Sequence, residues 1–187
     1  RITADKELII HHDSKVSVEK SLLSGANPYV ESWDLAELQK LGFCSFEELL
    51  QDTEVISQWR DQGKMVCLEL KRPHPRSPEG GGLFASQKVT NVLSEMILKA
   101  EEMLDEYSIP HGNSVFYAFH NKMHKSVKMA DSKRHWAELL PVVPRFGHSK
   151  IKRMMAYPQY FVTPFSRLIN KHRSRGASMA VSYTHLR

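Results

Sequence analysis

Three apolar runs alternate along the chain with longer segments whose apolar positions recur every three or four residues. The runs are Leu8–Ile10, Met65–Leu70 and Ser114–Phe119. Continuous apolar runs of this length are typical of strands buried on both faces of a parallel sheet. Because helix-type periodicity separates the runs, the pattern predicts an α/β fold in which parallel strands alternate with helices.

The helical segments are predicted from capping signals and amphipathic spacing. A capping-box pattern predicts a short helix over residues 34–41 and a second helix over residues 45–61. The longest amphipathic pattern covers residues 86–107. Residues 14–33 and the Pro- and Gly-rich residues 72–82 are predicted to be loops.

The second half of the chain has weaker signals. We expect a helix over residues 122–140, a short strand at Val142–Val143 and a basic amphipathic helix over residues 158–173. Residues 181–187 follow a polar stretch and are predicted to be a non-native tail. The remainder, residues 1–180, is predicted to be a single domain.

Charge is distributed unevenly within a formal net charge of +5. Residues 1–110 carry 12 Lys and Arg against 19 Asp and Glu, whereas residues 111–187 carry 14 against 2. A basic half can bind nucleic acid or anionic lipid, but the aromatic residues near this charge follow no recognisable nucleic-acid-binding motif. We therefore expect no nucleic-acid partner. No apolar run approaches the roughly 20 residues that span a bilayer.

Reactive side chains follow each of the three predicted strands. His12 follows the first strand, Glu69 and Lys71 end the second, and His120 follows the third. A carboxylate, a histidine and a lysine at strand ends suit a barrel enzyme that holds a metal and a phosphate. His11 points to the opposite face by strand alternation and is predicted to be packed or exposed rather than catalytic.

Several of these segments together resemble the glycerophosphodiester phosphodiesterase family. The segment Ile2–Asp13, the sequence Leu68-Glu69-Leu70-Lys71, the helical segments between them and the strand Val115–Phe119 occur in the family's order. The resemblance covers about residues 2–120. It implies a partial TIM (β/α)8 barrel and a metal-dependent hydrolase that splits a glycerophosphodiester into glycerol phosphate and an alcohol derived from a lipid head group.

The resemblance also implies roles for individual residues. His12 matches an acid/base histidine, Glu69 a ligand of the divalent ion, and Lys71 a lysine beside the phosphate. Oxygen ligands favour Mg²⁺ or Ca²⁺. His120, at the rim of the expected active site, is predicted to contact substrate.

The sequence departs from the family at its beginning. The family's His-Arg-Gly, Glu-Asn-Thr and Glu-x-Asp segments are absent, and they would precede Arg1. We therefore expect a barrel truncated at the N-terminus and incomplete at the C-terminus, inactive on its own.

One alternative is a non-catalytic module that binds nucleic acid or anionic lipid through residues 122–175. Another is a barrel phospholipase acting on intact lipids. Cys44 and Cys67 are predicted to be buried thiols.

Overall fold

A four-stranded parallel sheet organises the part of the chain that the computed structural model describes, namely residues 1–17, 27–82, 86–118, 123–140, 170, 173–177 and 179–182. The strands, in spatial order, are β1 (Val66–Glu69), β2 (Ser114–Ala118), β3 (His135–Leu140) and β4 (Met179–Ser182). The α-helices are α1 (Leu35–Lys40), α2 (Phe46–Gln51), α3 (Thr53–Arg60), α4 (Ser86–Glu106) and α5 (Met123–Ala130), and the short 3₁₀ helices are η1 (Val30–Ser32) and η2 (His111–Asn113).

The order of the strands in the sheet follows their order in the chain. Each strand pairs in parallel with the next, so the sheet grows in one direction. A doubly wound sheet reverses its strand order at a switch point, whereas the wall of a (β/α)8 barrel adds strands sequentially. The predicted α/β class with parallel strands is confirmed, and the described strands have the order of a barrel wall.

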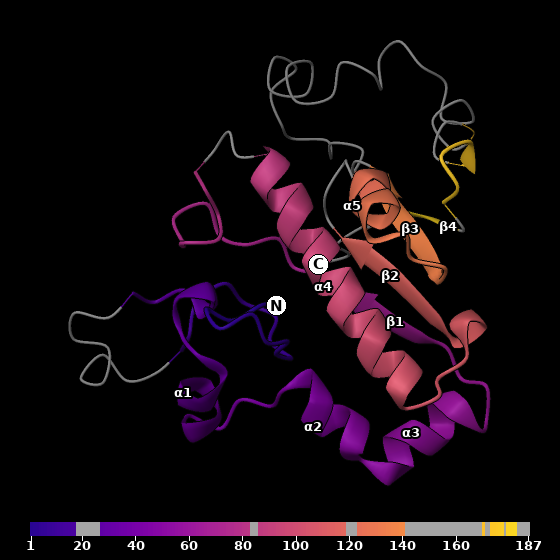
Figure 1. Cartoon of the computed structure of the whole chain (residues 1–187), viewed down its shortest axis with the longest axis horizontal. Helices are drawn as coiled ribbons and strands as arrows, with labels where there is room; N and C mark the ends of the chain where they lie inside the picture. The colour runs from indigo at the N-terminus through magenta and orange to yellow at the C-terminus, as the bar shows by residue number, and fades with distance from the viewer. Residues whose placement is uncertain are drawn as a thin grey trace, which may run out of the picture.

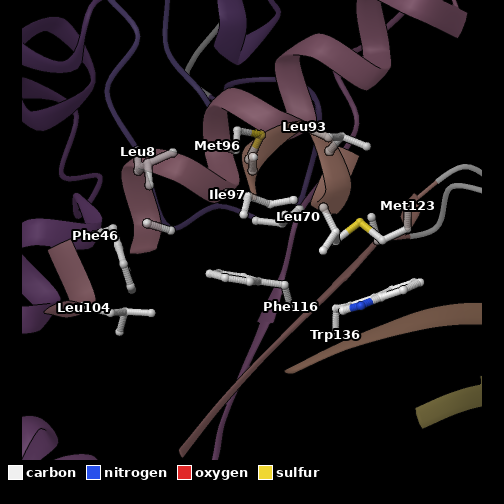
Figure 2. Packing of buried hydrophobic residues seen from close by; sticks show 14 of the residues in the cluster. Leu8, Phe46, Leu70, Leu93, Met96, Ile97, Leu104, Phe116, Met123 and Trp136 are labelled. Atoms are coloured by element: carbon white, nitrogen blue, oxygen red, sulfur yellow. The ribbon is translucent and has the colours of Figure 1, made fainter. Parts of the chain in front are cut away.

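Helices α4 and α5 pack against each other and cover one face of the sheet (Figure 1). The core lies beneath them, where Phe116 of β2 and Trp136 of β3 point toward the apolar side chains of both helices (Figure 2). The α4 positions at the predicted three- and four-residue spacing are buried, including Leu93 and Ile97 at 0% exposure. The amphipathic pattern therefore reflects one helix face against a sheet.

The sheet register decides which side chains share the opposite face. Glu69 is paired with Tyr117, the neighbour of Phe116. Because side chains alternate along a strand and Phe116 faces the helices, Tyr117 and Glu69 lie on the face turned away from α4. The candidate residue Glu69 therefore lies on this face, beside Tyr117.

The first helices begin where the capping pattern predicts. Glu37 accepts a hydrogen bond from the Asp34 N–H at 3.0 Å, and Ser45 and Glu48 cap each other reciprocally at 2.7 and 3.0 Å. The predicted single helix over residues 45–61 is instead two helices. Asp52 ends α2 and accepts hydrogen bonds from the first N–H groups of α3, so its side chain starts a new helix.

The predicted strand at Leu8–Ile10 is wrong. Residues 1–9 form a tight hairpin in which Arg1 and Ile9 exchange main-chain hydrogen bonds of 2.8 and 3.0 Å, and Lys6 has a positive φ of 69° at the turn. Leu8 and Ile9 make only isolated antiparallel bridges. Leu8 and Ile9 are nevertheless buried, at 6% and 1% exposure, whereas Ile10 is 46% exposed. The burial of two adjacent apolar residues explains the strand-like appearance of the run.

The predicted helix over residues 122–140 is correct only in its first half. Helix α5 ends at Ala130, and Trp136 lies in β3, because parallel pairing with β2 overrides a spacing that also fits a helix. The predicted strand at Val142–Val143 lies outside the described residues, as does nearly all of the predicted helix over 158–173. None of the described helices is both long enough and apolar enough to cross a membrane.

Candidate functional site

Glu69 and Lys71 meet at the carboxyl end of β1. Glu69 is the last residue of the strand, and Lys71 lies two residues further, so alternation places both on one face. Lys71 Nζ donates to Glu69 Oε1 at 2.5 Å, and the two side chains are 17% and 20% exposed respectively. The second oxygen, Oε2, accepts from the Tyr117 hydroxyl at 3.4 Å. Glu69 is thus a carboxylate held between a cation and a phenol, both partly shielded from water.

His12 is presented by the segment that follows the N-terminal hairpin. Its side chain is 79% exposed, and Nδ1 lies 2.9 Å from Asp13 Oδ1. This hydrogen bond to His12 lowers the pKa of the Asp13 carboxyl. His11 instead packs edge-on against Phe43 with ring centroids 4.9 Å apart, which agrees with its prediction as a packing residue.

Arg1 links these two parts of the site. Its Nη1 lies 2.9 Å from Glu31 Oε1 in an ion pair whose side chains are 7% and 1% exposed. Its Nε and Nη2 donate to the His12 carbonyl at 3.3 and 3.1 Å, and Nη1 also donates to the Arg72 carbonyl at 3.3 Å. Burial lowers the pKa of the Arg1 guanidinium, and the neighbouring Glu31 opposes that shift.

A pocket of about 520 Å³ brings the predicted residues together. Arg1, His11, His12, Glu69 and Lys71 line it together with apolar side chains from the hairpin, α2, α3, β1 and α4. Because it borders consecutive residues of β1, it lies along the edge of the sheet and reaches both faces. Cys67 of β1 also lines this pocket. The prediction that Cys44 and Cys67 are buried is wrong, because both are free and exposed thiols.

The loop after Lys71 has a fixed fold. His74 stacks on Tyr29 with ring centroids 4.0 Å apart, and burial lowers its pKa. Its carbonyl accepts from the Ser77 N–H and hydroxyl at 2.9 and 2.8 Å. A Cβ at Gly80 would lie 1.8 Å from the same carbonyl oxygen, so only glycine fits there. This loop therefore forms a shaped border beside the strand end.

The described residues do not complete a metal site. No group of three or more His, Cys, Asp or Glu side chains within them is arranged to hold a metal ion. Glu69 is the carboxylate that borders the pocket, and Lys71 already neutralises it. The described residues therefore do not fit Mg²⁺ or Ca²⁺ on their own.

Two of the sequence predictions lie partly or wholly beyond the described part of the chain. His120, predicted to contact substrate, is outside it. Of residues 122–175, the alternative binding surface, the structure describes 123–140, 170 and 173–175. Both stay predictions.

Sequence reasoning missed Arg1, Glu31 and Tyr117. Tyr117 could have been found by aligning the ends of the two predicted parallel strands, which places it beside Glu69. The contact between Arg1 and Glu31 joins positions 30 residues apart through a loop, and no periodic pattern reports such a contact.

The fold is similar to that of a solved structure, although no family model and no curated sequence matches the chain. The fold is similar to that in the crystal structure of "Putative glycerophosphoryl diester phosphodiesterase" from Silicibacter pomeroyi DSS-3, with a TM-score of 0.52 and 14% sequence identity. The similarity covers 98% of this chain and 70% of that one. At this identity the likeness concerns the fold alone.

Proposed function

We propose that this chain carries part of the active site of a phosphodiesterase that hydrolyses glycerophosphodiesters to glycerol phosphate and an alcohol. The observation that carries the proposal is the shared pocket, in which His12 lies with Glu69 and Lys71 at the end of a parallel strand. The similar fold of a protein named for this activity supports it. In this proposal the sheet is one wall of a (β/α)8 barrel, whose active site lies at the carboxyl ends of its strands.

His12 has the chemistry and exposure of a general acid. Hydrolysis of the diester places a hydroxyl group from water on phosphorus and breaks the phosphorus–oxygen bond to the alcohol, which leaves as an alkoxide that needs a proton. With Nδ1 donating to Asp13, the imidazolium form of His12 also carries a proton on Nε2, which it gives to the alkoxide. The proton that the attacking water loses passes to solvent, so the step balances. Asp13 fixes the orientation of the ring.

Lys71 has the charge that the reaction needs beside the phosphate. Negative charge increases on the phosphoryl oxygens in the transition state, and an ammonium group in a partly shielded pocket stabilises it. Lys71 is 17% exposed and lines the same pocket as His12. Its bond to Glu69 holds the ammonium group at the strand end.

Glu69 is the one candidate carboxylate ligand for a divalent ion that the described residues place at the pocket. We propose that the active protein uses Mg²⁺ or Ca²⁺ with Glu69 as one oxygen ligand, and that its other ligands lie outside the described residues. With one carboxylate bordering the pocket, we expect residues 1–187 alone to be inactive.

The test is hydrolysis of glycerophosphocholine by the full-length protein that contains this chain. We expect choline release that stops with EDTA and returns with Mg²⁺ or Ca²⁺. His12→Ala should lower turnover at least about 100-fold, as expected for a lost general acid. His111→Ala is a matched control, because His111 also lies beside an aspartate, with Nε2 3.4 Å from Asp105 Oδ1, but it precedes β2 at the other end of the sheet. Equal activity of the two variants would remove His12 from the mechanism.

A further inference from the structure

The buried ion pair between Arg1 and Glu31 is not used by the proposed chemistry. Glu31 lies in η1 and is 1% exposed, and its Oε2 has no hydrogen-bond partner among the described residues. Burying two charges costs desolvation energy that their attraction only partly offsets. Such a pair is a weak source of stability, and its better attested effect is to fix one arrangement of the chain.

The arrangement fixed here is that of the two halves of the site. The Arg1 guanidinium donates to the carbonyl of His12 and to that of Arg72, the residue after Lys71. One side chain therefore bonds to the main chain at both catalytic segments, which lie some 60 residues apart in sequence. The planar fork of a guanidinium reaches several acceptors at once, which a lysine ammonium cannot do with the same geometry.

Glu31 is itself anchored firmly. Its neighbour Val30 is fully buried in a small core with Ile9, Val16 and Leu38. The Val30 N–H donates to the Ser14 carbonyl at 3.1 Å, so η1 is bonded to the segment that follows His12. The position of the carboxylate is thus set by packing, and the carboxylate in turn sets that of Arg1.

We propose that Glu31 is a positioning residue for the reaction, acting through Arg1 to hold His12 at a fixed spacing from Glu69 and Lys71. This inference rests on the proposed function. Neither residue touches the reacting atoms in it. Small errors in the placement of a catalytic group lower the rate of the chemical step, so the effect belongs in kcat rather than in KM.

The experiment compares Glu31→Gln, Arg1→Lys and the double variant in the full-length protein. We expect each single variant to lower kcat for glycerophosphocholine about tenfold, within the range for a misplaced catalytic group, with KM changed less than about twofold. The double variant should lose little more than either single variant, since both remove the same link. Hydrogen exchange should quicken in peptides covering residues 9–16 and 70–76.

Asp105→Asn is the matched control for a purely structural effect. Asp105 is paired with the fully buried Arg134, away from the pocket. This variant should lower the melting temperature and leave kcat of the folded protein unchanged.

Unchanged kcat in Glu31→Gln, additive losses in the double variant, or unchanged hydrogen exchange would each overturn the inference. If Glu31→Gln does not fold, Arg1→Lys, which retains the buried positive charge, gives the test. If the unmodified protein hydrolyses nothing, the proposed function fails, and hydrogen exchange alone decides whether Glu31 holds the two segments together.

Discussion

Truncating Arg134 tests how much its buried guanidinium contributes to the stability of the contact between the sheet and helix α4. The Arg134 side chain is 0% exposed and donates to the Ile109 carbonyl at 3.0 Å and the Ser114 hydroxyl at 2.9 Å, and it is paired with Asp105. In Arg134→Ala, two buried acceptors lose a donor, at about 1 kcal/mol each. The lost packing of the aliphatic stem adds about 1 kcal/mol. Asp105 is half exposed and regains water, so it adds little.

We therefore expect Arg134→Ala to lower the free energy of unfolding by about 3 kcal/mol. With a urea m-value of about 2 kcal/mol/M, the unfolding midpoint should fall by about 1.5 M. Arg134→Met keeps most of the stem and should lose about 2 kcal/mol. Urea unfolding followed by circular dichroism measures both. A loss below about 1 kcal/mol in Arg134→Ala would contradict this prediction, because it would mean that these acceptors are satisfied without the guanidinium.

Three further predictions concern the core, the pH dependence and the pocket. Phe116→Ala removes a fully buried ring and should cost about 3–5 kcal/mol in urea unfolding, with a smaller loss contradicting its place in the core. The hydrogen bond to His12 lowers the pKa of Asp13 in the folded protein. The stability that this bond contributes is therefore fully present above the pKa of Asp13 in the unfolded chain. It is lost as the pH falls through the lower pKa of the folded protein. NMR titration should find that lowered pKa, and His12→Ala should return it toward its ordinary value; no change would show that the bond is absent. Cys67 lines the pocket, so glycerophosphocholine should slow its reaction with a thiol reagent while Cys44, outside the pocket, reacts unchanged. Equal rates with and without ligand would place the substrate elsewhere.

Local signals predicted the elements that local interactions determine. The capping boxes marked the starts of α1 and α2, and the apolar periodicity marked α4 almost to the residue. The secondary-structure predictions were wrong where contacts between distant segments determine the local conformation. Residues 135–140 fit a helical spacing, yet they form strand β3 because they pair in parallel with β2. The run at Leu8 is buried without a strand partner, since a hairpin rather than a sheet surrounds it.

The candidate site was also predictable only where its residues are placed by the pattern of strands in the sequence. Residues at strand ends can be found from sequence because parallel strands bring their carboxyl ends to one edge, and Glu69 and Lys71 lie there. His12 reaches the same pocket from a hairpin rather than from a strand. The contact between Arg1 and Glu31 depends on how η1 packs, and single-sequence patterns do not report it.

The proposed phosphodiesterase activity can be tested by following the phosphorus atom of the substrate. The full-length protein would be incubated with glycerophosphocholine and Mg²⁺ or Ca²⁺ in ¹⁸O-labelled water, and the products observed by ³¹P NMR. We expect glycerol phosphate with the isotope shift of one ¹⁸O on phosphorus, together with unlabelled choline. Absence of glycerol phosphate, or label found in choline, would contradict the claim that His12, Glu69 and Lys71 form a phosphodiesterase site.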